Sequence, residues 1–409
     1  MKEQVLIKNY KSIRDLSLPL NRLNVLIGSN GASKSNFISI FELRTIILCI
    51  LFFCVYALDT KAQTIEPEVN ENVELMSILA RMAGYPEYNM DMAGQYIKDM
   101  DEYFKSQTKH PAVQYMKELR NKYGISFDAV MSMAIHLINN QNGTFSLIDE
   151  EVPTLEKRWG KVDKTEFLTQ LGNFYKDSRF NDFFNAHKAL YEKGLKAYRE
   201  NVIKYLDTSW YSAFYGKEPQ EIFSVIIGFC NGGGNYGVNR HVRGNKKEVF
   251  AVVGYYVDKD DKPMYSKDYL PTLVHEFNHS FVNYLLDEKR YPGHVKDMEQ
   301  AATDIFELSK WAMAKQAYGN WKTMINESLV RAAVICYMLD NDYKPEEVKQ
   351  ELSEQIQRNF RWMPELVSLL RKYEKKQHKY GNFENFYPHI ITFFADVAKK
   401  ENEQFKVLN

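Results

Sequence analysis

The chain has few cysteines, no excess of charge of either sign and no apolar run long enough to cross a membrane. Its four cysteines in 409 residues are too few for a disulfide-stabilised scaffold. Lysine plus arginine and aspartate plus glutamate both number 53, so there is no global positive charge to attract a nucleic acid. The longest apolar run, residues 46–58, is shorter than the roughly 20 residues that a membrane-spanning helix needs. We therefore predict no nucleic-acid partner and no stable membrane span.

The composition is otherwise that of a globular protein, with 45% hydrophobic and 26% charged residues. A chain of this length forms two or three domains, or one large catalytic domain with helical additions. Cys230 and Cys336 are predicted to be small side chains of the core, or a disulfide pair if the protein is exported. The composition changes abruptly near residue 44, so we divide the chain there.

The first segment contains a phosphate-loop pattern. Residues 4–8 and 23–28 are predicted strands, and the second leads directly into a glycine-containing loop. In such a loop glycine lets backbone N–H groups surround phosphates, a lysine reaches the terminal phosphates and a hydroxyl binds Mg²⁺. Gly28, Lys34 and Ser35 have these residue types at the matching positions. They are the predicted nucleotide-binding residues.

The pattern is degenerate, because Ser33 stands where the motif has a glycine. Residues 7–41 resemble the amino terminus of RecF- and SMC-like ATPases, over about a tenth of the chain. These enzymes also need an acidic strand downstream to hold Mg²⁺ and the attacking water, and nothing after residue 43 continues them. We therefore expect residues 1–43 to be a truncated, inactive ATPase-like fragment.

Residues 44–63 have the order of a secretory signal, with Arg44, then the apolar run, then small residues that predict cleavage after Ala62. The alternative is a buried core helix. A signal normally begins at the amino terminus, whereas 43 residues precede this one. We expect export to the periplasm or the medium if the internal signal is used, and a cytoplasmic protein if the extension blocks it.

The remainder, 64–409, is predicted to be a mostly helical α+β protein with a small β-sheet. We expect a helical region over 64–215 and a catalytic region over 216–409. Its predicted parts are a polar linker over 64–74, helices over 75–215, strands at 221–230 and 249–257, a glycine-rich turn at 231–235 between them, and helices after Lys262.

The most informative motif is His275-Glu276-Phe277-Asn278-His279. Two histidines four apart lie on one face of a helix, so both imidazoles can bind one metal ion. Glu276 lies beside the first ligand, where a carboxylate can take a proton from water and pass it to a leaving group. The surrounding helix is apolar, and burying such a polar group requires compensation, which a divalent cation supplies. The predicted strand 249–257, which precedes the helix, is expected to be the edge strand that pairs with a substrate peptide.

This motif, followed by Asn326-Glu327 on a predicted helix, resembles the gluzincins, the thermolysin-like zinc metallopeptidases. The resemblance implies a zincin-like fold, Zn²⁺ bound by His275, His279 and Glu327, and Glu276 as catalytic base acting on a peptide or protein substrate. The segment 64–409 as a whole is similar to a family of exported bacterial proteins of undetermined function. Many gluzincins have an aspartate four residues after the glutamate ligand, where this chain has Arg331. That arginine is expected either to pair with Glu327 or to bind a substrate carboxylate.

Several alternatives stay open at this stage. Asp304 is the main rival to Glu327 as third ligand, and His294 and Asp297 lie nearer to the motif in sequence. For stabilising an oxyanion, His389 and Tyr387 are the candidates. The function predicted is that of a zinc metallopeptidase. The alternatives are a zinc amidase that is not a protease, a non-catalytic binding protein that retains a zinc site, and an ATPase-related protein; the sequence leaves the oligomeric state open.

Overall fold

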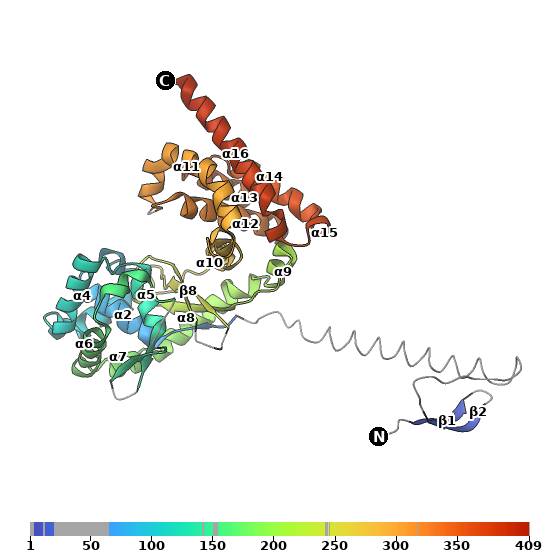
Figure 1. Ribbon diagram of the computed structural model, residues 1–409. Helices are drawn as coiled ribbons and strands as arrows, with labels where there is room; N and C mark the ends of the chain where they lie inside the picture. The colour runs from blue at the N-terminus through green and yellow to red at the C-terminus, as the bar shows by residue number, and fades with distance from the viewer. Residues whose placement is uncertain are drawn as a thin grey trace, which may run out of the picture. The chain divides into compact units, whose positions relative to one another are not determined.

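The computed structural model describes residues 4–10, 13–19 and 65–408, except 141–142, 150–153, 242–243, 245 and 317. It divides into two units, 1–64 and 65–409 (Figure 1).

In the first unit, strands β1 (Gln4–Tyr10) and β2 (Ile13–Pro19) form an antiparallel pair, with Ile7 opposite Leu16. The strand predicted over residues 4–8 is thus confirmed. The nucleotide-binding candidates Gly28, Lys34 and Ser35 lie outside the described residues, as do the second predicted strand and the signal-like segment.

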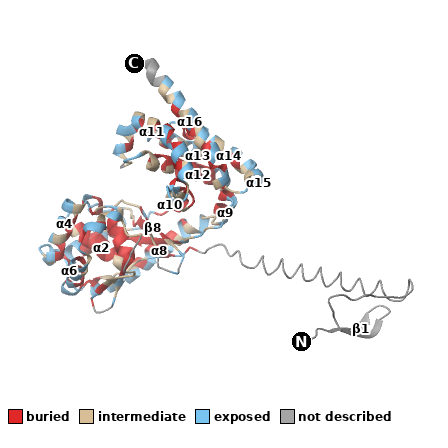
Figure 2. Ribbon diagram, viewed as in Figure 1, coloured by how far each residue is buried: buried red, intermediate tan, exposed pale blue. Residues whose placement is uncertain are grey.

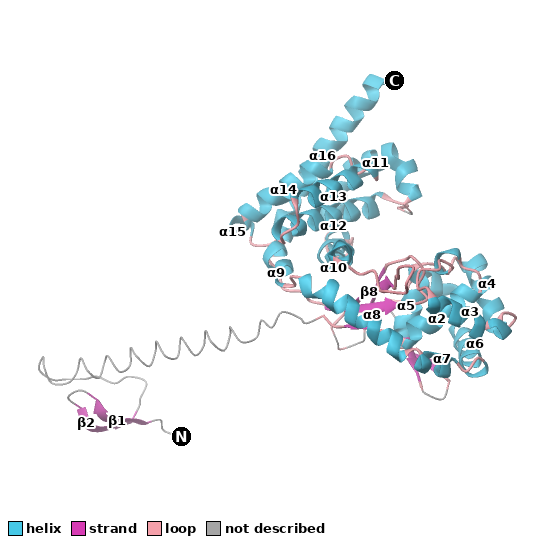
Figure 3. Ribbon diagram, turned by 180° about the vertical axis from the view of Figure 1, so that it is seen from behind, coloured by secondary structure: helices cyan, strands magenta, loops and turns pink. Residues whose placement is uncertain are grey.

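The second unit is α+β and mostly helical, as predicted (Figure 3). Its first helices are α2 (Glu71–Met82), α3 (Gln95–Tyr103), α4 (Pro111–Tyr123), α5 (Asp128–His136), α6 (Lys164–Asp177), α7 (Phe180–Ala186), α8 (Lys188–Asn201) and α9 (Ser209–Tyr215). After the sheet come α10 (Leu270–Val282), α11 (Pro292–Lys315), α12 (Trp321–Asp340), α13 (Pro345–Gln357), α14 (Met363–Lys375), α15 (Gln377–Tyr380) and α16 (Phe383–Leu408). Short 3₁₀ turns include η5 (Lys267–Tyr269) before α10 and η6 (Asn283–Leu286) after it.

The sheet that adjoins α10 has four strands in the order β3-β6-β8-β7. They are β3 (Pro67–Glu68), β6 (Ile222–Gly228), β7 (Tyr236–Arg240) and β8 (Glu248–Gly254). Strands β6 and β8 are parallel, whereas β7 runs antiparallel to β8. A separate hairpin joins β4 (Leu137–Asn139) to β5 (Phe145–Leu147).

One expectation about this sheet was wrong, and one strand was not predicted. The strand predicted over 249–257 corresponds to β8, which pairs on both sides and is therefore interior; the edge strands are β3 and β7. The prediction missed β7 because it is short and contains Gly237 and Asn239, which have low strand propensity.

The linker predicted over 64–74 was also wrong. Pro67 and Glu68 pair with β6, and α2 begins at Glu71, where the Asn70 side chain accepts hydrogen bonds from two backbone N–H groups of the first turn. Helix α2 then runs through the core and is buried along much of its length (Figure 2). Asn70 is thus the N-cap of a helix and not part of a linker.

Helix α10 is amphipathic, and this positions the motif. Leu273, Val274, Phe277 and Phe281 are buried against the core, while the residues between them at 275, 276 and 279 are only partly buried. Pro271 lies in the first turn, where its missing N–H costs no helical hydrogen bond. Helix α10 packs against α12, which is buried over most of its length. The packing of α10 against α12 therefore places residues that are far apart in the sequence next to one another.

Candidate metal centre

His275 and His279 on α10 and Glu327 on α12 form a group of metal-ligating atoms that all lie within 4.8 Å of one another. The Nε2 atoms of the two histidines are 3.2 Å apart. Glu327 Oε1 is 3.5 Å from His279 Nε2, and Glu327 Oε2 is 3.7 Å from His275 Nε2. In a tetrahedral zinc site with bonds of about 2.0–2.1 Å, ligand atoms are about 3.3 Å apart. The three residues therefore fit a zinc ion, and Glu327 is the candidate third ligand that the structure brings to the histidines.

The group is partly open to solvent. The side chains of His275 and His279 are 18% and 24% exposed, and that of Glu327 is 10% exposed. Three protein ligands with an accessible side match catalytic zinc sites, in which water or substrate takes the fourth position, whereas structural sites are closed by four protein ligands.

Asn283 orients His279. Its Oδ1 lies 3.1 Å from His279 Nδ1, so the ring donates from Nδ1 and keeps Nε2 free as a lone-pair donor toward the metal. Asn283 is not among the residues that the sequence predicted for the site. The available signal was its spacing, because a residue four positions after His279 lies on the same face of a helical turn.

Glu327 is held by two side chains. Tyr318 donates a hydrogen bond of 2.9 Å to its Oε2, and an Arg331 guanidinium nitrogen lies 3.1 Å from the same oxygen. Arg331 also donates to the Tyr318 hydroxyl at 2.7 Å and to Gln355 at 3.0 Å. Of the two roles expected for Arg331, pairing with Glu327 is the one that these contacts show. Tyr318 was missed because it precedes α12 and belongs to no helical periodicity.

The electrostatics favour the protonation states that bind metal. Burial lowers the pKa of His275 to about 3, against the opposing effect of Glu327. Burial alone would raise the pKa of Glu327, but His275, His279, Arg331 and the Tyr318 hydrogen bond outweigh it and lower that pKa. A neutral imidazole and an ionised carboxylate are the forms that coordinate zinc.

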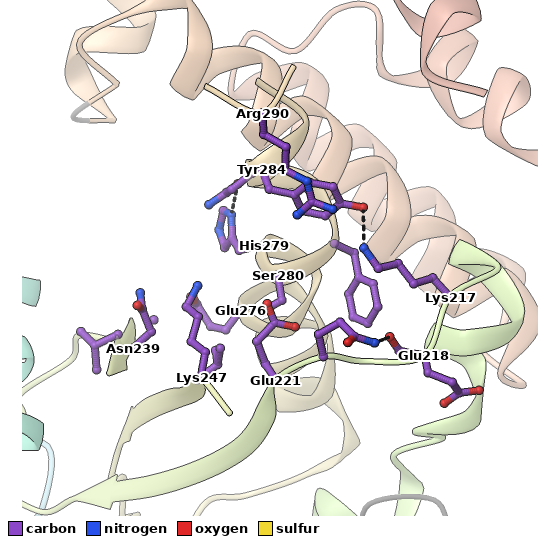
Figure 4. Close-up of a pocket in the computed structure, with 16 residues that line it drawn as sticks. Lys217, Glu218, Glu221, Asn239, Lys247, Glu276, His279, Ser280, Tyr284 and Arg290 are labelled. Carbon is purple, nitrogen blue, oxygen red and sulfur yellow. Dashed lines mark hydrogen bonds between the residues drawn. The ribbon is translucent and has the colours of Figure 1, made fainter. Parts of the chain in front are cut away.

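Glu276 lines a cavity of about 470 Å³ beside the ligands. Figure 4 shows it with His279, Asn239 and Lys247 around this space. Burial raises the pKa of Glu276, partly opposed by His279. A carboxylate with a raised pKa holds a transferred proton better than an ordinary one, as a general base that later acts as an acid requires.

The edge strand β7 passes directly along Glu276. A Cβ atom at Gly237 would lie 2.2 Å from Glu276 Oε2, so only glycine leaves the carboxylate its present position. Gly237 and Asn239 of β7 line the same cavity as Glu276 and His279. A strand at the edge of the sheet thus lies next to the carboxylate, although it is not the strand that the sequence predicted.

Residues 65–393 match the family described as "Domain of unknown function (DUF4932)". The chain belongs to this family. All three ligand candidates and Glu276 lie inside the DUF4932 region. Searches of curated proteins and of solved structures found no match. No helix among the described residues of the chain is long and apolar enough to cross a membrane.

The other site residues predicted within the DUF4932 region contact different partners. Asp304 accepts a hydrogen bond from Gln300, Asp297 is exposed, and the His294 ring stacks between those of Tyr291 and Tyr387. His389 packs against Tyr380 and Phe386. None of the predicted residues named here belongs to the ligand group or lines the cavity beside Glu276. Tyr387 is therefore a buried packing residue of α16, whereas His389 is an exposed residue of the same helix.

Proposed function

We propose that this protein is a zinc-dependent hydrolase of gluzincin type that cleaves peptide bonds. The observation that carries the proposal is the convergence of His275, His279 and Glu327 at tetrahedral zinc spacing, beside a cavity lined by Glu276.

A bound zinc ion would supply Lewis acidity, which polarises a carbonyl group and lowers the pKa of a water molecule. Glu276 then accepts the proton of the attacking water at its carboxylate and delivers it to the leaving amine nitrogen. Asn283 keeps the His279 ring in one tautomer, and Tyr318 keeps Glu327 in one orientation. An extended peptide would pair along β7, which lies at one edge of the sheet.

The metal ligands are tested by the zinc content of the full-length protein. We expect close to one zinc per chain by elemental analysis, and loss of zinc in Glu327→Ala. Asp304→Ala is the matched control, since it removes an acidic side chain of the same region that contacts Gln300 and none of the ligands. Zinc lost from the Asp304 variant and kept by the Glu327 variant would refute the ligand set.

The catalytic base is tested with Glu276→Gln in the zinc-loaded protein. General-base catalysis contributes roughly 10²–10⁴-fold, so we expect cleavage of a mixture of unstructured peptides, followed by mass spectrometry, to fall by at least about 100-fold with zinc content unchanged. Equal cleavage by the variant and the wild-type protein would contradict this role. Zinc bound without cleavage of any peptide by the wild-type protein would instead support a non-catalytic binding protein.

A further inference from the structure

We propose that Arg331 acts as an internal counter-cation for the metal centre: it neutralises Glu327 when the site is empty and opposes the metal when the site is filled. This inference rests on the proposed function, since it concerns the same three ligands. Because of Arg331, the protein stays folded without zinc. For the same reason, the site binds zinc more weakly than its three ligands alone would.

The contacts that support a counter-cation are those of the Arg331 side chain with Glu327, Tyr318 and Gln355. Arg331 is 9% exposed and lies one helical turn after Glu327, so the pair is buried and fixed in place. A buried carboxylate is costly unless a cation compensates it. In the empty site Arg331 compensates this carboxylate, because its permanently charged guanidinium lies 3.1 Å from Glu327 Oε2.

A bound metal ion would compete with Arg331 for this carboxylate. Arg331 contacts Glu327 Oε2, which leaves Oε1 toward His279. A dication bound there would lie close to a guanidinium that cannot lose its proton and is held by Tyr318 and Gln355. The two like charges repel in a poorly solvated place, where such interactions are strong. Removing the arginine charge should therefore lower the stability of the zinc-free protein and increase its zinc affinity. The two effects are linked, because zinc binding stabilises the folded state.

The test is the zinc affinity of the full-length protein and of Arg331→Met, measured by competition with a chromogenic chelator, together with the thermal unfolding midpoint with and without zinc. We expect Arg331→Met to bind zinc at least tenfold more tightly. Its unfolding midpoint should fall in the zinc-free protein and return to the wild-type value when zinc is saturating. Arg331→Lys, which keeps the charge, should stay within threefold of the wild-type affinity.

Arg361→Met is the matched control. The Arg361 side chain is 46% exposed and pairs with Glu401, so its charge is engaged outside the centre. Its removal should change zinc affinity by less than threefold. An equal or weaker affinity of Arg331→Met would overturn the proposal while leaving the zinc hydrolase intact. Zinc bound by Arg331→Met but not by the wild-type protein would support the counter-cation and refute the hydrolase, and zinc bound by neither would refute both.

Discussion

Single residues determine how the groups of the candidate metal centre are placed, and Gly237 is the clearest case. Because the carboxylate of Glu276 occupies the space of its absent Cβ, the strand and the proposed base can lie in contact. Gly237 leaves this space free because it has no side chain. A substitution there would therefore displace the Glu276 carboxylate and leave the fold unchanged.

We expect Gly237→Ala to lower peptide cleavage by at least tenfold, because the added methyl group must displace the flexible end of Glu276. Zinc content should not change, since no ligand touches this position. Gly293→Ala is the control, as a Cβ there meets nothing within 4 Å. Full activity of the Gly237 variant would show that Glu276 does not work from its present position.

Asn283 leads to a second prediction. Replacement by leucine removes the acceptor that orients His279, and loss of such outer contacts typically costs about 10–100-fold in metal affinity. Asn283→Asp should keep or tighten zinc binding, because a carboxylate accepts the same hydrogen bond more strongly. Affinities would be measured by chelator competition, and equal affinities for all three proteins would refute the orienting role.

The sequence predicted the parts of the site that depend on one helix and missed those that depend on tertiary contacts. The histidines and Glu276 follow from helical spacing, and Glu327 followed from the gluzincin resemblance. Tyr318 could not be found in this way, because its contact with Glu327 depends on how the chain approaches α12. The edge position of β7 depends on strand order, which a run of residues does not encode.

At the scale of elements, α2 and β6 are joined through a buried acid. Glu74 on α2 accepts hydrogen bonds from the backbone N–H of Phe229, just after β6, and from the Tyr96 hydroxyl. Burial raises its pKa to about 7, although these hydrogen bonds oppose the shift. The junction between the helical region and the sheet thus contains a carboxyl group that titrates near neutrality.

The raised pKa of Glu74 makes the stability of the fold depend on pH in a defined direction. Since the folded-state pKa lies above the ordinary value of 4.5, the proton bound by Glu74 stabilises the fold fully below about pH 4.5, and this contribution is lost as the pH rises through about 7. Glu374, with a pKa raised to about 8, chiefly by burial, acts in the same direction. We expect the free energy of urea unfolding to depend less on pH between about 5 and 8 in Glu74→Gln than in the wild-type protein.

The control for this experiment is Glu102→Gln, which removes the same charge from a side chain that is 79% exposed. Its pH dependence should match that of the wild-type protein. If Glu74→Gln also matched the wild-type protein over the whole range, Glu74 would have an ordinary pKa in the folded state.

At the scale of the molecule, residues 65–409 form one compact unit, and its core includes buried residues of α10 and α12, the two helices of the candidate metal centre. The family match begins at the same residue, 65. A chain with its own core is expected to fold alone.

We therefore predict that residues 65–409, produced by themselves, unfold at the same temperature as the corresponding transition of the full chain and hold the same amount of zinc. Calorimetry and elemental analysis would check both quantities. A midpoint lower by more than a few degrees would show that residues 1–64 contribute to the stability of this unit.

The two cysteines of this unit are free and fully buried, as the sequence analysis expected of core side chains. Burial raises the pKa of both thiols well above the ordinary value, so neither reacts with an alkylating reagent until its surroundings open. Cys230 follows β6, whereas Cys336 lies on α12, the helix that carries Glu327. Residues 65–409 thus contain two natural reporters of local opening, Cys230 beside the sheet and Cys336 on the helix that carries Glu327. The ratio of their labelling rates reports whether the metal centre opens by itself or only when the whole unit unfolds.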